Sequence, residues 1–312
     1  MKHTLSATLV LLTFFLLSQF VGLFFVAGDV SGISVVDDQL VVVHPQTAMG
    51  ERPEFTGVQS VIYIAVAVLI GTLMVLGLAK LKANKLWKFW YLLAVFVSIS
   101  ISIGVFFSKL VAVITAIVLV LLKFYKRNLF THNVSELLIY AGIAVLLVPL
   151  FDLFWIIMLL LLISIYDMYA VWKSKHMITL AKFTAESNLF AGFSVDYDKK
   201  KIHTGIKPLK MQGSKSSNKK AILGGGDVLF PLLFTAVVME TLFKSGMSLV
   251  SSYWLASIIC LTSTLSLYLL FKYSKKDTFY PAMPFLSLGC FVGGIVTWLI
   301  MFLLLVSDIS IL

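Results

Sequence analysis

Charged residues are scarce in this chain of 312 residues, of which only 13% are Asp, Glu, Lys or Arg. Soluble domains contain about 25% charged residues and about 45–50% apolar residues. Here 60% of the side chains are hydrophobic and the mean hydropathy is +0.99, which excludes a soluble domain. Long apolar runs recur, and about 20 such residues span a hydrocarbon core of about 30 Å. The chain is therefore an integral membrane protein.

Cysteine and histidine are also scarce, and their positions exclude several kinds of site. Cys260 and Cys290 both fall within apolar runs, which predicts buried thiols and no disulfide framework. No His-Glu-x-x-His motif of a zinc protease is present. No histidine falls within an expected span, although a rhomboid-type serine site would need one there. We therefore expect no metal and no cofactor.

The net charge of +10 is not accompanied by a basic domain outside the apolar runs, so we expect no nucleic-acid partner. The apolar runs instead predict an all-α polytopic membrane protein of about nine transmembrane helices, of which the fourth is short. We expect the first run to be a retained helix because it is longer than the apolar h-region of a signal peptide, about 7–15 residues, and more spans follow it. The expected spans are 5–27, 58–79, 89–107, 110–122, 134–150, 153–172, 221–240, 248–270 and 285–306.

Basic residues lie almost entirely on one set of alternate connections, which hold 22 of the 25 Lys and Arg residues. The other set holds only Arg52, Lys109 and Lys244. By the positive-inside rule the N-terminus and the 173–220 loop are cytoplasmic and the C-terminus lies outside. An even number of spans would remove this bias, which supports a count of nine.

The two longest connections divide the chain and carry local structure of their own. Valines around residues 33–43 of the outer connection predict a small hairpin. In the 173–220 loop, residues 174–186 predict a surface helix, and the alternation within 190–206 predicts a strand. We therefore expect three parts: a six-helix part over 1–172, a cytoplasmic loop over 173–220, and a three-helix part over 221–312.

Two aspartates stand inside expected spans, Asp167 in the sixth and Asp227 in the seventh. A charged group at membrane depth costs at least about 2.5–3.5 kcal/mol and indicates a functional site. No lysine or arginine lies within the core of either span to pair with them. Glu136 and Glu240 are instead expected at helix ends, with their carboxylates reaching the interface.

The depths of these aspartates predict that they meet. Asp167 precedes the cytoplasmic end of its span by five residues, about 7.5 Å, and Asp227 follows the start of the next by six, about 9 Å. Consecutive spans are antiparallel and usually adjacent. Two close carboxylates share one proton, so one can activate water while the other donates a proton to a carbonyl oxygen. This arrangement suits peptide hydrolysis.

Residues around the aspartates fit this chemistry. Gly224, Gly225 and Gly226 precede Asp227 without side-chain bulk, so a helix or an extended substrate can approach closely. Pro231 has no N–H to bond the carbonyl of Asp227, so the helix is loosened there. Two prolines enclose Ala282 and Met283 in the run Pro281-Ala282-Met283-Pro284, which predicts an extended segment before the ninth span.

These residues resemble the presenilin and signal peptide peptidase family of intramembrane aspartyl proteases, and most closely its archaeal presenilin homologues. That family has nine helices, Tyr-Asp in the sixth, Gly-x-Gly-Asp in the seventh and Pro-Ala-Leu before the ninth. The sequence here has Tyr166-Asp167, Gly224-Gly225-Gly226-Asp227 and Pro281-Ala282-Met283 in the same order. Met283 replaces leucine, a swap of similar volume. The run 175–181 also looks like the archaeal members.

The resemblance implies that Asp167 and Asp227 are the catalytic pair and that Tyr166, Gly224–Gly226 and Pro281–Met283 support the site. It further implies that the substrates are single-span membrane proteins, and that the 173–210 loop binds an unwound substrate by strand addition. We expect a multi-pass protein of the cell membrane with its active site near the cytoplasmic face. Prepilin-type peptidases share Gly-x-Gly-Asp but have fewer spans. A proton- or cation-coupled transporter or channel and a membrane scaffold are the alternatives from other classes.

Overall fold

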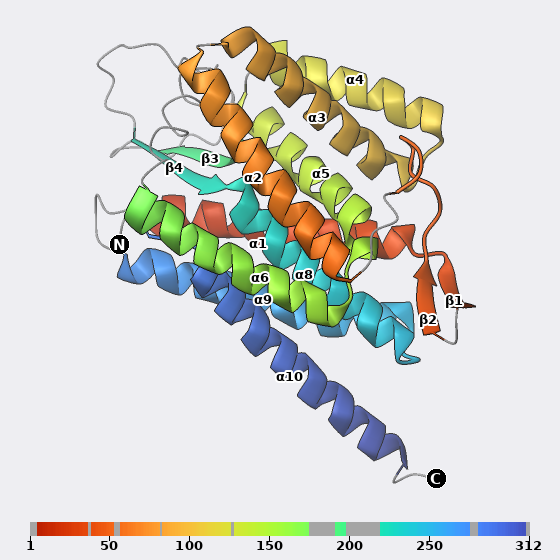
Figure 1. Ribbon diagram of the computed structural model, residues 1–312. Helices are drawn as coiled ribbons and strands as arrows, with labels where there is room; N and C mark the ends of the chain where they lie inside the picture. The colour runs from red at the N-terminus through yellow and green to blue at the C-terminus, as the bar shows by residue number, and fades with distance from the viewer. Residues whose placement is uncertain are drawn as a thin grey trace.

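The structure, a computed structural model, describes residues 5–36, 39–52, 57–81, 83–125, 128–174, 191–197, 219–274 and 280–309. Within these residues it is mainly helical, with two small hairpins at opposite ends of the helix bundle (Figure 1). The described helices are α1 (Leu5–Asp29), α2 (Val58–Lys80), α3 (Asn84–Gly104), α4 (Lys109–Tyr125), α5 (Leu129–Leu147), α6 (Leu153–Tyr169), α8 (Gly225–Lys244), α9 (Leu249–Tyr273) and α10 (Met283–Ile309).

Eight of the described helices are long and apolar enough to cross a membrane. The exception is α4, which has 17 residues and matches the expected short fourth span. The all-α polytopic architecture is thus confirmed. The third and fifth spans begin five residues earlier than expected, at Asn84 and Leu129, because their first turns contain polar residues that a hydropathy pattern alone leaves out.

Polar caps explain several helix starts. The side chain of Asn128 accepts a hydrogen bond from Phe130 N–H at the start of α5, and Asp152 accepts one from Trp155 N–H at the start of α6. Such bonds satisfy N–H groups that have no partner within the helix. Between these two helices, Pro149 lies in a short 3-10 turn (Val148–Leu150), and having no N–H it ends regular α-helix there.

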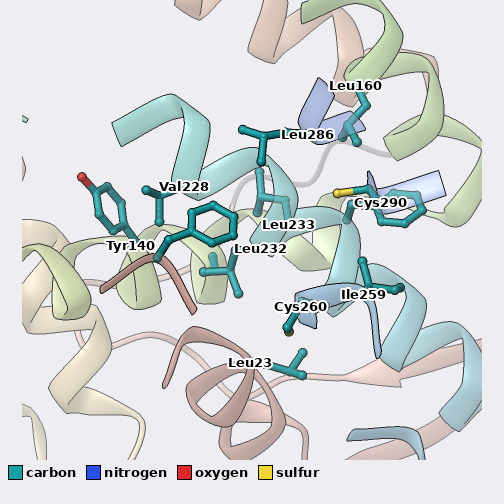
Figure 2. Close-up of a cluster of buried hydrophobic side chains, with 14 of the residues drawn as sticks. Leu23, Tyr140, Leu160, Val228, Leu232, Leu233, Ile259, Cys260, Leu286 and Cys290 are labelled. Atoms are coloured by element: carbon teal, nitrogen blue, oxygen red, sulfur yellow. The ribbon is translucent and has the colours of Figure 1, made fainter. Parts of the chain in front are cut away.

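The core is built around α8, which contacts α1, α5, α6, α9 and α10. Figure 2 shows side chains of these helices converging on Val228, Leu232 and Leu233 of α8. Cys260 and Cys290 belong to this core as buried free thiols, as predicted. Large apolar side chains on α2, α4, α9 and α10 are exposed instead. A membrane supplies the apolar surroundings that such faces require.

Both predicted strand regions are confirmed. At one end, β1 (Gly32–Val36) pairs with β2 (Gln39–Val43) as the expected hairpin. At the other end, β3 (Gly192–Tyr197) pairs antiparallel with β4 (Lys219–Gly224). The predicted surface helix over 174–186 falls almost wholly outside the described residues; of that stretch, Ser174 ends a π-turn (Ala170–Ser174).

The predicted start of the seventh span is wrong. Residues 221–224, expected to begin it, belong to β4, and α8 begins only at Gly225. A short apolar run such as this is compatible with either a strand or a helix, and periodicity alone does not distinguish them. These residues form a strand because they pair with β3, a segment that lies elsewhere in the sequence.

Candidate active site at Asp167 and Asp227

Asp167 lies in the last turn of α6 and is buried, with 8% of its surface exposed. Its Oδ2 accepts a hydrogen bond from the backbone N–H of Met283, over 3.1 Å, and the backbone of Ala282 supplies a second hydrogen bond. A carboxylate that accepts backbone N–H bonds is stabilised in its charged form. The segment before α10 therefore fixes the position of the Asp167 side chain.

The Pro281–Pro284 segment delivers these backbone groups because it is not helical until Met283. Pro281 is buried, and α10 begins at Met283, so the Met283 N–H is one of the first-turn donors that lack a partner within their own helix. About one turn before Asp167 in α6 and one turn after Met283 in α10, the hydroxyls of Ser164 and Ser287 lie 2.8 Å apart. Two polar contacts thus hold α10 against α6, and the sequence pattern had not singled out this serine pair.

Asp227 is the third residue of α8, and Gly224 is the N-cap of this helix. Asp227 therefore stands in the first helical turn, where unpaired N–H groups favour a negative charge. Asp227 was expected six residues into its helix, and this was wrong. Residues 221–224 belong to β4, so only Gly225 and Gly226 precede Asp227 in α8. The aspartate is half-buried and its neighbour Gly226 is exposed, so the site can be approached from this side.

Two of the three glycines occupy places that have no room for a side chain. A Cβ at Gly224 would lie 3.1 Å from Oδ2 of Asp227, and a Cβ at Gly225 would lie 2.9 Å from the hydroxyl oxygen of Tyr140. Both distances are shorter than ordinary van der Waals contact. At Gly226 the nearest atom is a ring carbon of Phe230 at 3.7 Å, so the third glycine has space around it.

The two aspartates come from helices that pack together, since α6 contacts α8. Asp167 and Asp227 are close enough for the charge on Asp167 to act on Asp227. Like charges at short range favour a shared proton over two full charges. The geometry therefore provides two carboxyl groups that can hold different protonation states, next to an exposed glycine.

Gln19 of α1 is a contact that the sequence pattern did not reveal. Its side-chain N–H donates to the backbone carbonyl of Val228, the residue after Asp227, over 2.9 Å. Pro231 follows in the same helix and cannot donate to the carbonyl of Asp227. Gln19 therefore braces α8 where its own hydrogen bonding is interrupted. The available signal was an amide side chain within an apolar span.

Tyr166 lies beside Asp167 in sequence and joins α6 to α2. Its hydroxyl is 3.4 Å from Oγ1 of Thr72. The contact ties the helix that carries Asp167 to α2, a helix with largely exposed side chains.

An apolar cavity of about 470 Å³ lies elsewhere, between α6, α8 and α10. Its lining contains no ionisable side chain, and its α6 residues, Leu153 and Ile157, precede Asp167 by at least ten residues, about 15 Å of helix. This cavity is separate from the aspartates. Among the described residues no group of three or more His, Cys, Asp or Glu is arranged to hold a metal ion.

Glu136 and Glu240 do not reach an interface as expected but are buried in ion pairs, which is a correction. Glu136 Oε1 lies 2.6 Å from Nζ of Lys123 on α4, and Glu240 Oε1 lies 3.3 Å from Nε2 of His44. His132, expected just outside the fifth span, lies in the first turn of α5, because this helix begins at Leu129. The partners of Glu136 and Glu240 come from other segments of the chain, Lys123 on α4 and His44 after β2. The hydropathy pattern of one span could not indicate them.

Comparison with known proteins supports the class that the helices and the aspartates define. A family model described as signal-peptide peptidase, presenilin aspartyl protease matches residues 21–304. No curated protein matches the chain. Two solved structures are similar in fold; both are described as a presenilin family intramembrane aspartate protease, in C222 and P2 space groups respectively. They have TM-scores of 0.57 and 0.54, each with 16% identity, and cover 93% and 95% of this chain and 99% and 98% of their own. The chain belongs to the signal-peptide peptidase and presenilin aspartyl protease family.

Proposed function

We propose that this multi-pass membrane protein is an intramembrane aspartyl endopeptidase whose catalytic pair is Asp167 and Asp227. The ionised carboxylate removes a proton from a water molecule, and the resulting hydroxide attacks the scissile carbonyl carbon. The protonated carboxyl group donates its proton to the carbonyl oxygen, giving a gem-diol. Collapse of this intermediate breaks the C–N bond as a proton passes to the amine nitrogen. The observation that carries the proposal is that two acidic side chains, buried Asp167 and half-buried Asp227, stand on α6 and α8, two apolar helices that pack together.

The supporting residues have separate roles in this proposal. The backbone of Ala282 and Met283 orients Asp167. Gly224 and Gly225 let the backbone pass close to Asp227 and Tyr140. The remaining members of the three motifs lie around the pair: Tyr166 joins α6 to α2, Pro281 precedes the start of α10, and Gly226 leaves space beside Asp227. No cofactor takes part in the reaction.

The substrates are single-span membrane proteins, bound in extended form. A peptide bond within a helix has its backbone hydrogen-bonded and is poorly accessible, so a span must unwind before hydrolysis. The β3–β4 sheet has only two strands among the described residues and runs directly into the segment before Asp227. An unwound substrate segment can add to it as a third strand, with main-chain hydrogen bonds supplying affinity.

We infer from the positive-inside rule that the site lies near the cytoplasmic face of the cell membrane. The described helix ends next to the lysine-rich connections, such as the end of α6 and the start of α8, lie at the β3–β4 end of the bundle, where Asp167 and Asp227 also lie. The three expected parts, over 1–172, 173–220 and 221–312, act together, because α8 of the last part packs between α1, α5 and α6 of the first.

A cleavage assay tests the proposal. Purified protein in detergent is incubated with a synthetic peptide that contains one apolar span of about 20 residues. Asp167→Asn and Asp227→Asn each abolish product formation, whereas Asp152→Asn, which preserves a capping side chain on α6, cleaves as wild type does. Product from either active-site variant contradicts the assignment. Ion flux through liposomes without any peptide cleavage indicates a transporter instead.

A further inference from the structure

The edge of β3 that faces away from β4 is occupied by side chains of α5. Oε2 of Glu136 accepts a hydrogen bond from Gly192 N–H over 3.1 Å, and Nε2 of His132 lies 2.9 Å from the carbonyl oxygen of Gly192. Two α5 side chains thus satisfy both backbone groups of one strand residue. Such groups would otherwise be open to another strand.

Asn133 makes the same kind of contact two residues further along β3. Its Oδ1 accepts from Ser194 N–H over 3.2 Å, and its Nδ2 donates to the Ser194 carbonyl oxygen over 3.1 Å. The amide group therefore takes the place of a paired strand residue. Asn133 is buried, with 3% of its surface exposed, and so is Ser194, so water does not compete for these bonds.

The α5 side chains are themselves held in place. Glu136 accepts a hydrogen bond from Lys123 of α4 and another from the hydroxyl of Tyr140, both over 2.6 Å. The Tyr140 ring packs edge-on against Phe193, with 5.6 Å between ring centroids. The contact from α5 to β3 is thus a rigid polar clamp, formed by His132, Asn133 and Glu136.

The clamp determines which edge of the hairpin is open. Gly192 and Ser194 direct their polar groups towards α5, so their pairs with Gly224 and Ile222 are the non-hydrogen-bonded pairs of the ladder. The backbone groups of Ile222 on β4 therefore face away from β3. Among the described residues, β4 provides the edge that a third strand can join.

The link between β4 and Asp227 cannot hold this edge in position alone. It consists of Gly224, Gly225 and Gly226, and glycine restricts the backbone less than any other residue. The hydrophobic alternation of β3, with Phe193 and Val195 buried, resists a slip of one residue but less strongly a slip of two. The two hydrogen bonds between Asn133 and Ser194 form only when Ser194 lies opposite Asn133, so they exclude a register shifted by two residues.

We propose that Asn133 is a positioning residue that determines cleavage specificity, because it fixes the β3–β4 hairpin relative to Asp227 and thereby selects the peptide bond that is cut. This inference rests on the proposed proteolytic function and on strand addition to β4. Without the clamp, the substrate strand takes up registers that differ by two residues, about 6.6 Å along the strand. Hydrolysis then spreads to neighbouring peptide bonds.

The test compares Asn133→Ala with Ser135→Ala in the full chain. Ser135 is an equally buried neighbour whose hydroxyl, within the described part of the chain, bonds only to the carbonyl of Thr131 in its own helix. Products from the synthetic single-span peptide are mapped by mass spectrometry, and amide hydrogen exchange is measured over 192–197. For Asn133→Ala we expect the dominant product to lose about half of its share to products cut at adjacent bonds, with faster exchange in β3. Ser135→Ala gives the wild-type map and the wild-type exchange.

Unchanged exchange in β3 overturns the anchoring, and faster exchange with an unchanged product map overturns the role in specificity. If wild-type protein cleaves nothing, the proposed function fails and the specificity role fails with it, while exchange still reports the anchoring separately. Asn133→Asp retains the acceptor for Ser194 N–H and replaces Asn133→Ala if the latter does not elute as folded protein. It should show the same change in product map to a smaller degree.

Discussion

Met283 and Asp167 are 116 residues apart in the sequence, yet the Met283 N–H donates to Oδ2 of Asp167 over 3.1 Å. The contact uses only the backbone of Met283, although its side chain is also buried. The proline-rich segment thereby couples the start of α10 to the carboxylate at the end of α6. The role of the Met283 backbone, which holds Asp167, can therefore be tested separately from that of the Met283 side chain, which packs in the core.

Met283→Pro removes this N–H at the first residue of α10, where a helix accepts proline. We expect cleavage of the synthetic peptide to fall by about tenfold, corresponding to about 1.4 kcal/mol of lost stabilisation. Met283→Leu retains the N–H and a similar volume, so its rate should equal that of wild type. Equal rates for both variants would show that the hydrogen bond has no role in catalysis.

Gln19→Leu should separate activity from stability. The variant removes the donor to Val228 and also removes Oε1 of Gln19, which is buried without a hydrogen-bond partner among the described residues. Loss of an unsatisfied oxygen offsets loss of the bond, so Tm should not fall. The cleavage rate should fall by about three- to tenfold, since α8 loses its brace beside Asp227.

Ser18→Ala is the matched control for Gln19, because the hydroxyl of this buried neighbour bonds, as far as the described residues show, only to the carbonyl of Phe15 in its own helix. Its rate should match that of wild type. A decrease in Tm with unchanged kcat in Gln19→Leu would mean that the amide serves only helix packing.

Gly293→Val should separate α10 from α9. A Cβ at Gly293 would lie 2.2 Å from Oγ1 of Thr262 and 2.8 Å from Cα of Ile259. Overpacking of this kind costs about 1–3 kcal/mol, so Tm in detergent should fall by several degrees. Gly77→Val is the control, because a Cβ at Gly77 in α2 would meet no atom within 4 Å. Equal Tm values for the two variants would contradict this close helix packing.

His44 makes stability depend on pH at the β1–β2 end. Its Nδ1 lies 2.8 Å from Oδ2 of Asp29, its Nε2 lies 3.3 Å from Oε1 of Glu240, and Arg52 pairs with Asp29 over 2.5 Å. Burial by itself lowers the pKa of His44. The hydrogen bonds with Asp29 and Glu240 and the negative charges of both residues outweigh this effect, and the pKa rises from 6.5 to about 9.

Because the pKa of His44 is higher in the folded state, its contribution to stability is complete below pH 6.5 and is lost as the pH rises through about 9. At about 1.4 kcal/mol per pKa unit, the change in the free energy of unfolding is on the order of 3 kcal/mol. We expect the Tm of wild type to fall across this window, while His44→Gln shows a flatter profile and a lower Tm at pH 6. Parallel profiles would exclude His44 as the responsible group.

Most of the architecture could be predicted from the sequence because the bilayer imposes a simple rule. Apolar runs of sufficient length must be helices, since unpaired backbone groups are not tolerated in hydrocarbon. The start of α8 is where the rule failed. Residues 221–224 are apolar enough for a span, but pairing with β3 satisfies their backbone as a strand.

The site could be predicted only where a residue is unusual for its surroundings. Asp167 and Asp227 were visible because an acidic residue in an apolar span is costly. Gln19, Asn133 and Ser164 were not, because single amides and hydroxyls are common in membrane helices and their partners lie on other elements.

The sequence alone determined that this chain is a helical membrane protein with one motif in its sixth span, one in its seventh and one just before its last, because each of these is a local property of the chain. Packing alone decided that Met283 reaches Asp167, that α5 closes one edge of β3, and that Glu136 and Glu240 are buried in ion pairs. Those contacts join residues from distant parts of the chain, and a hydrogen bond or an ion pair forms only where the folded backbone brings its two partners together.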